Sequence, residues 1–229
     1  MPPIVNRLAN LSSTRLALLA KQTYTQVEDV LHAEPIAIIG MGCRFPGGAD
    51  NPRAYWDLLR NGVDATGEVP GDRWDADAYY AEDFAAPGKM NTRRGGFLRK
   101  VDEFDAAFFG IPPREAERMD PQQRLLLEVG CEALEDAGLT HAQVDESLTG
   151  VFVASYHNDY TLRQYADPES INLRTLTGTL HSIVANRLSF FLNLRGPSMA
   201  LDAACSSSLV AVHVACQSLR TRDSDMCLA

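Results

Sequence analysis

Apolar residues recur along the chain with two different spacings, and the alternation of these spacings predicts an α/β fold. Short apolar runs at 36–39 and 150–154 are typical of strands that are buried on both faces. Longer segments at 121–137 and 176–192 carry apolar residues at the three- and four-residue spacing of a helix. Because continuous apolar strands alternate with helices, the sequence predicts a layered fold with a covered sheet.

Several of the expected helices have recognisable ends. Asn51-Pro52 and Asp120-Pro121 each combine an N-cap side chain with a proline at the first helical position, and Gly138 ends the second of these helices. Shorter helices are expected over 112–118 and 158–166.

The segment 198–209 predicts a strand, a tight corner and a helix, and it carries the candidate catalytic residue, Cys205. Ala203 and Ala204 leave room for a substrate at the corner, and the helix begins at or just after Cys205. There the thiol lies beside unpaired N–H groups and the positive end of the helix, which favour a thiolate. The serines at 206–208 are expected to cap the first turn. The helix is apolar nearly all round, which predicts that it is buried.

Composition and charge argue against several classes of protein. The chain has 229 residues, of which 45% are apolar, as in globular proteins that bury a core. No apolar run approaches the roughly 20 residues of a membrane span, and the N-terminus lacks a signal peptide, so we expect a cytoplasmic protein. The net charge of −9 argues against nucleic-acid binding.

The cysteines and glycines exclude two kinds of site. Five cysteines without a C-x-x-C pair argue against a disulfide framework and a zinc site, and we expect Cys131, Cys216 and Cys227 to fill the core. Gly40 and Gly42 follow an expected strand, but a phenylalanine occupies the third glycine position of a dinucleotide fingerprint. We therefore expect no bound nucleotide or other cofactor.

Two segments differ from the rest of the chain. Residues 1–33 predict one amphipathic helix, either a linker or a docking helix, because a single apolar stripe needs a partner. Residues 64–83 hold seven acids and one base, whereas residues 84–100 hold five bases and no acid. We interpret these stretches as solvated loops that neutralise each other; the alternative is that the basic stretch contacts an acidic partner protein.

A cysteine nucleophile usually works with a histidine, and the sequence does not identify one. His213 lies about 12 Å from Cys205 along the same expected helix and is out of reach. His157 follows a strand end and His181 lies in a mostly apolar helix, and a structural role is the simpler interpretation of both. The residues alone leave three possibilities open: a thioester-handling transferase, a cysteine hydrolase using His157 or His181, and a non-catalytic docking scaffold.

Five motifs in a fixed order resemble the β-ketoacyl synthase (ketosynthase) domains of modular type I polyketide synthases, over about residues 34–229. The nucleophile motif is DAACSSSL, and Ala203 within it departs from the threonine of many relatives. The other motifs are EPIAIIGMGCRFPG from Glu34, FFGIPPREA from Phe108, MDPQQRLLLE from Met119 and ANRLSFFLNLRGPS from Ala185.

The resemblance implies a thiolase-like layered α-β-α-β-α fold, of which this chain is expected to form the N-terminal half, truncated after the nucleophile helix. It implies that Cys205 accepts an acyl chain from the phosphopantetheine arm of an acyl carrier protein. A malonyl-type extender then loses CO₂, and its carbanion attacks the thioester in polyketide or fatty acid biosynthesis. The domain itself binds no cofactor.

The same resemblance implies a homodimer, contacts with other domains of the synthase, and backbone N–H groups, including that of Cys205, around the oxyanion. It places the two assisting histidines beyond Ala229. We therefore expect residues 34–229 to be part of a ketosynthase domain that is poorly stable and inactive alone, with residues 1–33 as a linker or docking helix for an upstream carrier protein.

Overall fold

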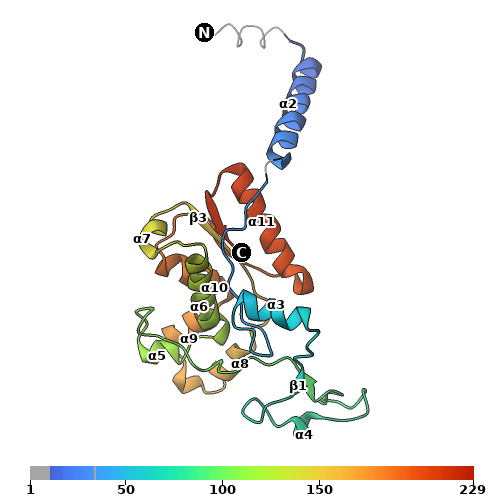
Figure 1. The fold of residues 1–229 in the computed structure, drawn as a ribbon, viewed down its shortest axis with the longest axis vertical. Helices are drawn as coiled ribbons and strands as arrows, with labels where there is room; N and C mark the ends of the chain where they lie inside the picture. The colour runs from blue at the N-terminus through green and yellow to red at the C-terminus, as the bar shows by residue number, and fades with distance from the viewer. Residues whose placement is uncertain (1–10, 34) are drawn as a thin grey trace.

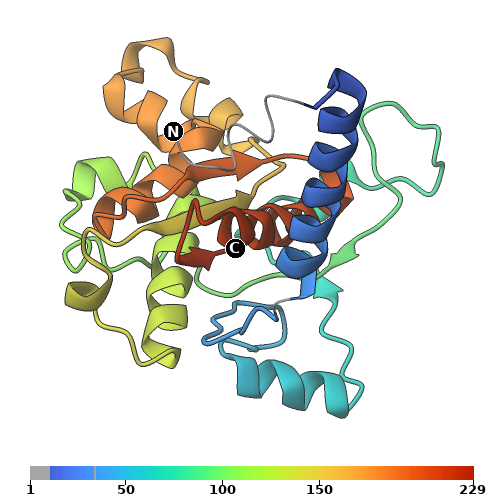
Figure 2. The ribbon, with the colours of Figure 1, turned by 90° about the horizontal axis from the view of Figure 1, so that it is seen from above.

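A computed structural model describes residues 11–33 and 35–229, and a three-stranded parallel sheet forms its centre (Figure 1). The central strand β3 (Thr149–Ala154) pairs with β4 (Ser198–Leu201) on one side and with β5 (Met226–Leu228) on the other. Figure 2 shows these strands side by side from above. The parallel strands are joined through helices, which confirms the predicted α/β fold.

Helices cover both faces of this sheet. Val151 and Phe152 are consecutive residues of β3, so their side chains point to opposite faces. Val151 packs into a cluster with residues of α6 (Pro121–Asp136) and α10 (His181–Phe191). Phe152 packs against Ala211 and Ala215 of α11 (Ser207–Thr221) on the other face. The described body is therefore built from three layers, helix, sheet and helix.

The predicted helix starts are confirmed by side-chain caps. Asn51 accepts a hydrogen bond of 2.9 Å from the Ala54 N–H at the start of α3 (Pro52–Arg60). Asp120 accepts one of 2.8 Å from the Gln122 N–H at the start of α6. These caps satisfy N–H groups that have no partner within the helix.

The remaining elements are short, apart from α2 and α9. They are α2 (Ser13–Ala33), β1 (Gly67–Glu68), α4 (Ala76–Tyr79), β2 (Arg94–Gly95), α5 (Pro113–Ala116), α7 (His141–Val144), α8 (Tyr160–Gln164), η1 (Pro168–Ser170), α9 (Leu173–Thr179) and η2 (Ala204–Ser206).

The prediction of a strand at 36–39 is wrong. This segment belongs to no sheet of the described structure, and Ile38 and Ile39 are 82% and 57% exposed. An extended apolar run becomes a strand only when a neighbouring strand supplies backbone partners, and the described residues supply none here.

The helix expected over 176–192 is divided in two at Leu180, whose ψ of 131° is extended. The break follows a close approach of two backbones. The Asp120 N–H donates to the Gly178 carbonyl at 2.8 Å, and a Cβ on Gly178 would lie 2.1 Å from the Arg118 carbonyl oxygen. A tertiary contact therefore interrupts a segment whose apolar spacing is continuous.

Helix α11 is buried on one side only, which corrects the prediction of a fully buried helix. Ser207, Ala211, Ala215 and Ser218 form its buried stripe. Leu209 on the outer side is 75% exposed. Val212 on the same helix is 49% exposed. Apolar surface that the sequence pattern predicts to be buried is therefore open in this chain.

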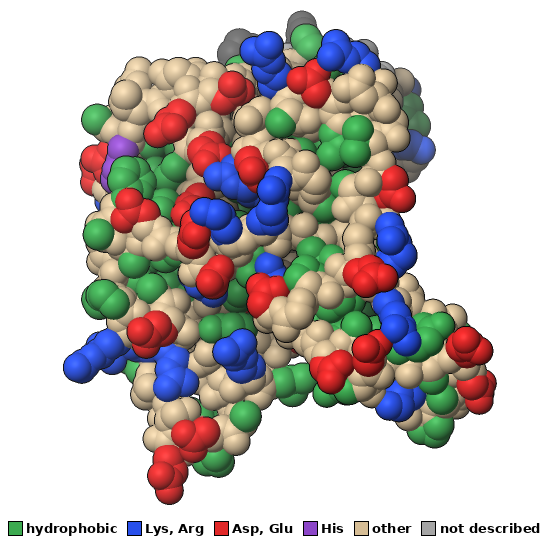
Figure 3. Space-filling view, turned by 60° about the horizontal axis from the view of Figure 1, so that its bottom comes forward, with side chains coloured by type: hydrophobic (Ala, Val, Ile, Leu, Met, Phe, Trp, Pro, Cys, Tyr) green, Lys and Arg blue, Asp and Glu red, His purple; other side chains and the backbone are tan. Residues whose placement is uncertain are grey.

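The lobe formed by β1, α4 and β2 projects from the body (Figure 1) and contains most of the two charged stretches. Arg93 pairs with Asp77 at 2.6 Å and lies 4.1 Å from the centre of the Tyr80 ring. Lys89 donates to the Ala78 carbonyl and Arg94 to that of Thr66. The Arg93–Asp77 ion pair joins the basic stretch to the acidic one, which supports the interpretation that the stretches neutralise each other. On the face in Figure 3, acidic and basic side chains are interspersed.

Helix α2 extends away from the body in Figure 1, and Leu18 and Leu19 on it are 60% and 42% exposed. The C-terminal part of its expected apolar stripe, at positions 27, 30 and 31, lies outside the side chains that the structure describes. None of the described helices combines the length and apolar character needed to cross a membrane.

Candidate functional site at the Cys205 corner

Cys205 lies where the chain leaves the carboxyl end of β4 and enters α11. It is the middle residue of η2, and its side chain is exposed. In α/β sheets, ligands bind outside the carboxyl ends of the parallel strands. The predicted strand–corner–helix arrangement is therefore confirmed, and it presents the thiol at the edge where a substrate is expected.

The corner depends on an unusual backbone conformation at Ala204. Its φ of +51° lies in the left-handed region, which an alanine rarely adopts because of its Cβ. The Ala204 N–H donates to Asp202 Oδ1 at 2.9 Å. Ser207 Oγ accepts from the Ala203 N–H at 2.8 Å and donates to the Ala204 carbonyl at 2.7 Å. These three hydrogen bonds, made by the side chains of Asp202 and Ser207, hold the two residues just before Cys205.

The backbone N–H of Cys205 has no hydrogen-bond acceptor among the described residues, whereas the next N–H, of Ser206, donates to the Ala203 carbonyl at 3.2 Å. An unoccupied N–H beside an exposed thiol is the arrangement that stabilises the oxyanion formed when a nucleophile attacks a carbonyl.

The sequence predicts that the serines at 206–208 cap α11, but they do not. The N-cap residue Ser206 makes no side-chain cap, and its hydroxyl donates instead to the Ala203 carbonyl at 2.8 Å. The Ser207 hydroxyl is used within the corner, and Ser208 is exposed and makes no side-chain hydrogen bond in the described structure. Because Ala204 turns the backbone sharply, these hydroxyls lie against corner carbonyls and not against the free N–H groups of the helix.

The turn after β3 lies beside the corner and is tethered from two sides. The Ser155 N–H donates to the Leu201 carbonyl at 3.1 Å, which extends the pairing of β3 with β4 by one residue. Gln122 Nε2 donates to the His157 carbonyl at 2.9 Å and to Asp120 Oδ2 at 3.2 Å. Burial raises the pKa of Asp120 above its usual value. The sequence interpretation missed Gln122, although the Asp-Pro-Gln-Gln motif was visible at the helix start.

Among the described residues, no hydrogen bond joins a histidine ring to the Cys205 thiol. His157 lies on the turn beside the corner, and its exposed ring packs on Tyr156 with centroids 4.5 Å apart. His181 Nε2 is buried without a hydrogen-bond partner, and His213 is exposed on α11. Of these three histidines, His157 lies on the turn that pairs with the end of β4, beside the corner.

The other four cysteines are partly buried, whereas Cys205 is exposed. Burial raises the pKa of Cys131 to about 11, and it also raises the pKa of Cys43 and Cys227. Groups of three or more metal-binding side chains are absent from the described structure. The site is therefore a lone exposed thiol and its surrounding backbone.

We predict that iodoacetamide at pH 8 alkylates Cys205 at least about 10-fold faster than Cys131 in the folded protein. Cys131 is expected to be almost entirely protonated at this pH, because burial raises its pKa to about 11. Raising the pH toward 11 should accelerate modification of Cys131. Peptide mass spectrometry measures both sites, with denatured protein as the control in which the difference disappears. Faster alkylation of Cys131 at pH 8 would contradict the prediction.

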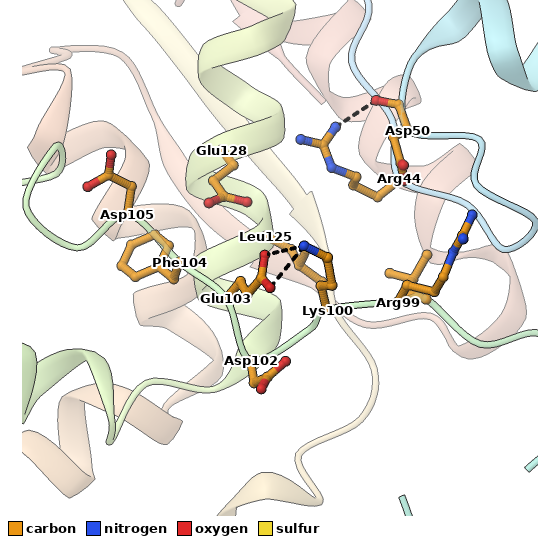
Figure 4. A pocket seen from close by; sticks show the side chains of 11 residues that line it. Arg44, Asp50, Arg99, Lys100, Asp102, Glu103, Phe104, Asp105, Leu125 and Glu128 are labelled. Atoms are coloured by element: carbon orange, nitrogen blue, oxygen red, sulfur yellow. Dashed lines mark hydrogen bonds and ion pairs between the residues drawn. The ribbon is translucent and has the colours of Figure 1, made fainter. Parts of the chain in front are cut away.

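Two surface hollows lie apart from the corner. One of about 710 Å³ is bordered by loop residues 98–105, α6 and the loop around Arg44 (Figure 4). Within it, Lys100 pairs with Glu103 at 3.0 Å, and Arg44 pairs with Glu132 and donates to the Asp50 carbonyl at 2.8 Å. Another of about 580 Å³ lies beside Phe190. Cys205 lines neither hollow, so we locate the candidate chemistry at the corner.

Comparison with known protein families identifies the family to which this chain is similar. The model of the β-ketoacyl synthase N-terminal domain matches residues 33–229. The chain belongs to the β-ketoacyl synthase family. This match confirms the resemblance drawn from the five motifs.

Its relatives include components of polyketide synthases. The chain is 48% identical over 224 residues to one component of the phenolphthiocerol/phthiocerol polyketide synthase of Mycobacterium tuberculosis, covering 98% of the chain and 14% of that relative. It is 52% identical over 207 residues to another component of that synthase from the same organism, covering 89% of the chain and 10% of the relative. The chain thus corresponds to a small part of these large synthase polypeptides.

Solved ketosynthases share the fold. The oxazolomycin ketosynthase domain of Streptomyces albus is 42% identical, with a TM-score of 0.75, over 81% of this chain and 32% of that one. The ketosynthase from module 6 of the bacillaene synthase of Bacillus subtilis is 39% identical, with a TM-score of 0.72, over 83% and 30%. The predicted thiolase-like fold class is confirmed, and the chain spans about a third of each solved ketosynthase.

Proposed function

We propose that this chain supplies the acyl-accepting cysteine of a polyketide synthase ketosynthase, with Cys205 as the nucleophile. The observation that carries the proposal is the exposed thiol at the corner, next to its own unoccupied N–H, in a chain of the β-ketoacyl synthase family. The proposal divides the chain into two parts: residues 34–229 belong to the ketosynthase domain, and residues 1–33 form a linker or docking helix.

In the first step, Cys205 Sγ attacks the thioester carbonyl of an acyl chain carried on the phosphopantetheine arm of an acyl carrier protein. The Cys205 N–H stabilises the negative oxygen of the tetrahedral intermediate. The bond from the acyl carbon to the pantetheine sulfur breaks, and that sulfur leaves as a thiol. The acyl chain is then held as a thioester on Cys205.

In the second step, a malonyl-type thioester on a carrier protein loses CO₂ and becomes a carbanion equivalent. It attacks the Cys205 thioester carbonyl, a carbon–carbon bond forms, and the Cys205 sulfur is released. No described histidine ring is bonded to Cys205, and the proposal assigns no histidine of this chain to catalysis. The proposed partners are an acyl carrier protein, other synthase domains and a second copy of the chain.

The test uses the full-length protein that carries this chain. It is incubated with an acyl pantetheine thioester and a malonyl-loaded carrier protein, and mass spectrometry follows the protein and the carrier. We expect an acyl adduct on the Cys205 peptide and a β-ketoacyl carrier. Release of free acid without a condensed product would instead favour the cysteine hydrolase, with His157 as the neighbouring candidate base. No adduct on Cys205 would contradict both enzyme functions and favour a docking scaffold.

A further inference from the structure

Ser207 is the first residue of α11 and is only 5% exposed, although it lies within a run of exposed residues. Its hydroxyl makes two hydrogen bonds. Oγ accepts from the Ala203 N–H at 2.8 Å and donates to the Ala204 carbonyl at 2.7 Å. One buried hydroxyl therefore joins the start of the helix to both residues of the corner that precede Cys205.

One of the two bonded residues, Ala204, has an unfavourable backbone conformation. Ala204 has a φ of +51°, and an alanine left to itself prefers negative φ because its Cβ is crowded in the left-handed region. Such conformations persist when the surroundings hold them, and they are concentrated at functional sites. Apart from Ser207, the side chain that bonds the Ala204 backbone is Asp202, through the Ala204 N–H at 2.9 Å.

The conformation of Ala204 sets the direction in which the following residue leaves the corner. If Ala204 relaxed to negative φ, the peptide unit between Ala204 and Cys205 would rotate. Both the Cys205 N–H and the Cys205 Cα–Cβ bond would then change direction. The thiol and the N–H serve one substrate carbonyl, so their relative placement matters as much as their presence.

We propose that Ser207 is a positioning residue for Cys205: its hydroxyl holds Ala204 in the left-handed conformation that aims the thiol and the Cys205 N–H at the same acyl carbonyl. The inference rests on the proposed role of Cys205 and extends it to a residue that does not touch the substrate. Ser207 acts through the backbone, so its loss leaves the thiol present but misaligned.

The neighbouring serines provide a matched control. Ser208 is one residue further along α11, is exposed and makes no side-chain hydrogen bond in the described structure. Ser208→Ala removes a hydroxyl from the same motif without touching the corner. An effect caused only by changing the polarity or helix propensity of this motif would appear in both variants.

The experiment measures acyl transfer from an acyl pantetheine thioester to Cys205 in the full-length protein. For Ser207→Ala, we expect the rate constant at saturating donor to fall about 10- to 100-fold, since a misplacement of about 1 Å costs up to about 100-fold. We expect KM to change less than about threefold, because the donor-binding surface is unaltered. Ser208→Ala is expected to load at the wild-type rate.

A second substitution tests the mechanism. In the Ser207→Ala background, Ala204→Gly is expected to restore part of the lost rate, because glycine adopts positive φ without the Cβ penalty. Asp202→Ala, at an exposed side chain, removes the other side-chain bond to the Ala204 backbone and is expected to lower the rate without impairing folding. Asp202→Ala therefore keeps the inference testable if Ser207→Ala does not fold.

The outcomes separate this inference from the function on which it rests. If the wild-type protein does not load Cys205, the proposed function is wrong. If the wild type loads and Ser207→Ala loads equally fast, the positioning role is wrong and the function stands. If Ser207→Ala does not fold, an Asp202→Ala variant that loads at the wild-type rate has the same consequence. Equal losses in the Ser207 and Ser208 variants, or a Ser207→Ala effect confined to KM, also overturn it.

Discussion

The full-length protein carrying Cys205→Ala is expected to lose acyl loading by about a thousandfold or more. Alanine has no atom that can form the thioester, and the free N–H and the surrounding surface accelerate only a reaction that still has a nucleophile. Residue 205 is exposed, and alanine fits the same backbone, so folding should be unaffected. Mass spectrometry of the protein after incubation with an acyl pantetheine thioester measures the loss directly.

Cys216→Ala is the matched control for this variant. It removes a partly buried thiol from α11, the helix that follows the corner, and should leave loading unchanged. His157→Ala adds a second comparison. Loss of free-acid release in that variant would indicate a hydrolase, whereas retained loading on Cys205 is expected for the acyl transferase. Transfer of the acyl group to another cysteine in Cys205→Ala would contradict the assignment of the nucleophile.

Gly196→Ala is expected to destabilise the sheet by about 3 kcal/mol, which corresponds to about 100-fold faster amide exchange in β3 and β4. A Cβ at this position would lie 2.4 Å from the carbonyl carbon and oxygen of Thr149 and 2.6 Å from the Gly150 nitrogen. All three atoms are backbone at the start of β3, so no side chain can move aside to relieve the clash. Hydrogen–deuterium exchange of peptides covering the two strands in the full-length protein measures the effect.

Gly71→Ala controls for the replacement of a glycine as such. No atom lies within 4 Å of a Cβ built on Gly71, and its backbone does not have positive φ. This variant should leave exchange in both strands at the wild-type rate. Gly196→Ala with unchanged exchange would show that the two strands are less closely packed at their start than the structure indicates.

Local chemistry at several positions was sufficient to predict elements of the fold. Asn51-Pro52 and Asp120-Pro121 start helices because the capping side chain and the proline act on adjacent residues. The candidate nucleophile was also visible from local pattern, since the alternating apolar residues, the small residues and the apolar helix around Cys205 are contiguous. Each of these signals lies within one or two helical turns of the feature that it predicts.

The predictions that were wrong concern segments whose structure depends on residues far away in the sequence. Residues 36–39 have the composition of a strand, but pairing requires a neighbour that the described chain does not place beside them. The break at Leu180 follows the close approach of Gly178 to the Arg118 backbone, 60 positions earlier. The outer side of α11 is exposed for a related reason, because the described chain covers only one side of this apolar helix.

By itself, the sequence determined the α/β class, most helix starts and the location of an exposed cysteine between a strand and a helix, because these depend on residues close together in the chain. Only the tertiary structure decided how that cysteine is presented. The left-handed Ala204, the buried hydroxyl of Ser207 and the tether from Gln122 to the turn after β3 depend on backbone conformation and packing. Serine and alanine tolerate many conformations, so their identity alone does not specify a strained corner; the surrounding hydrogen bonds select it.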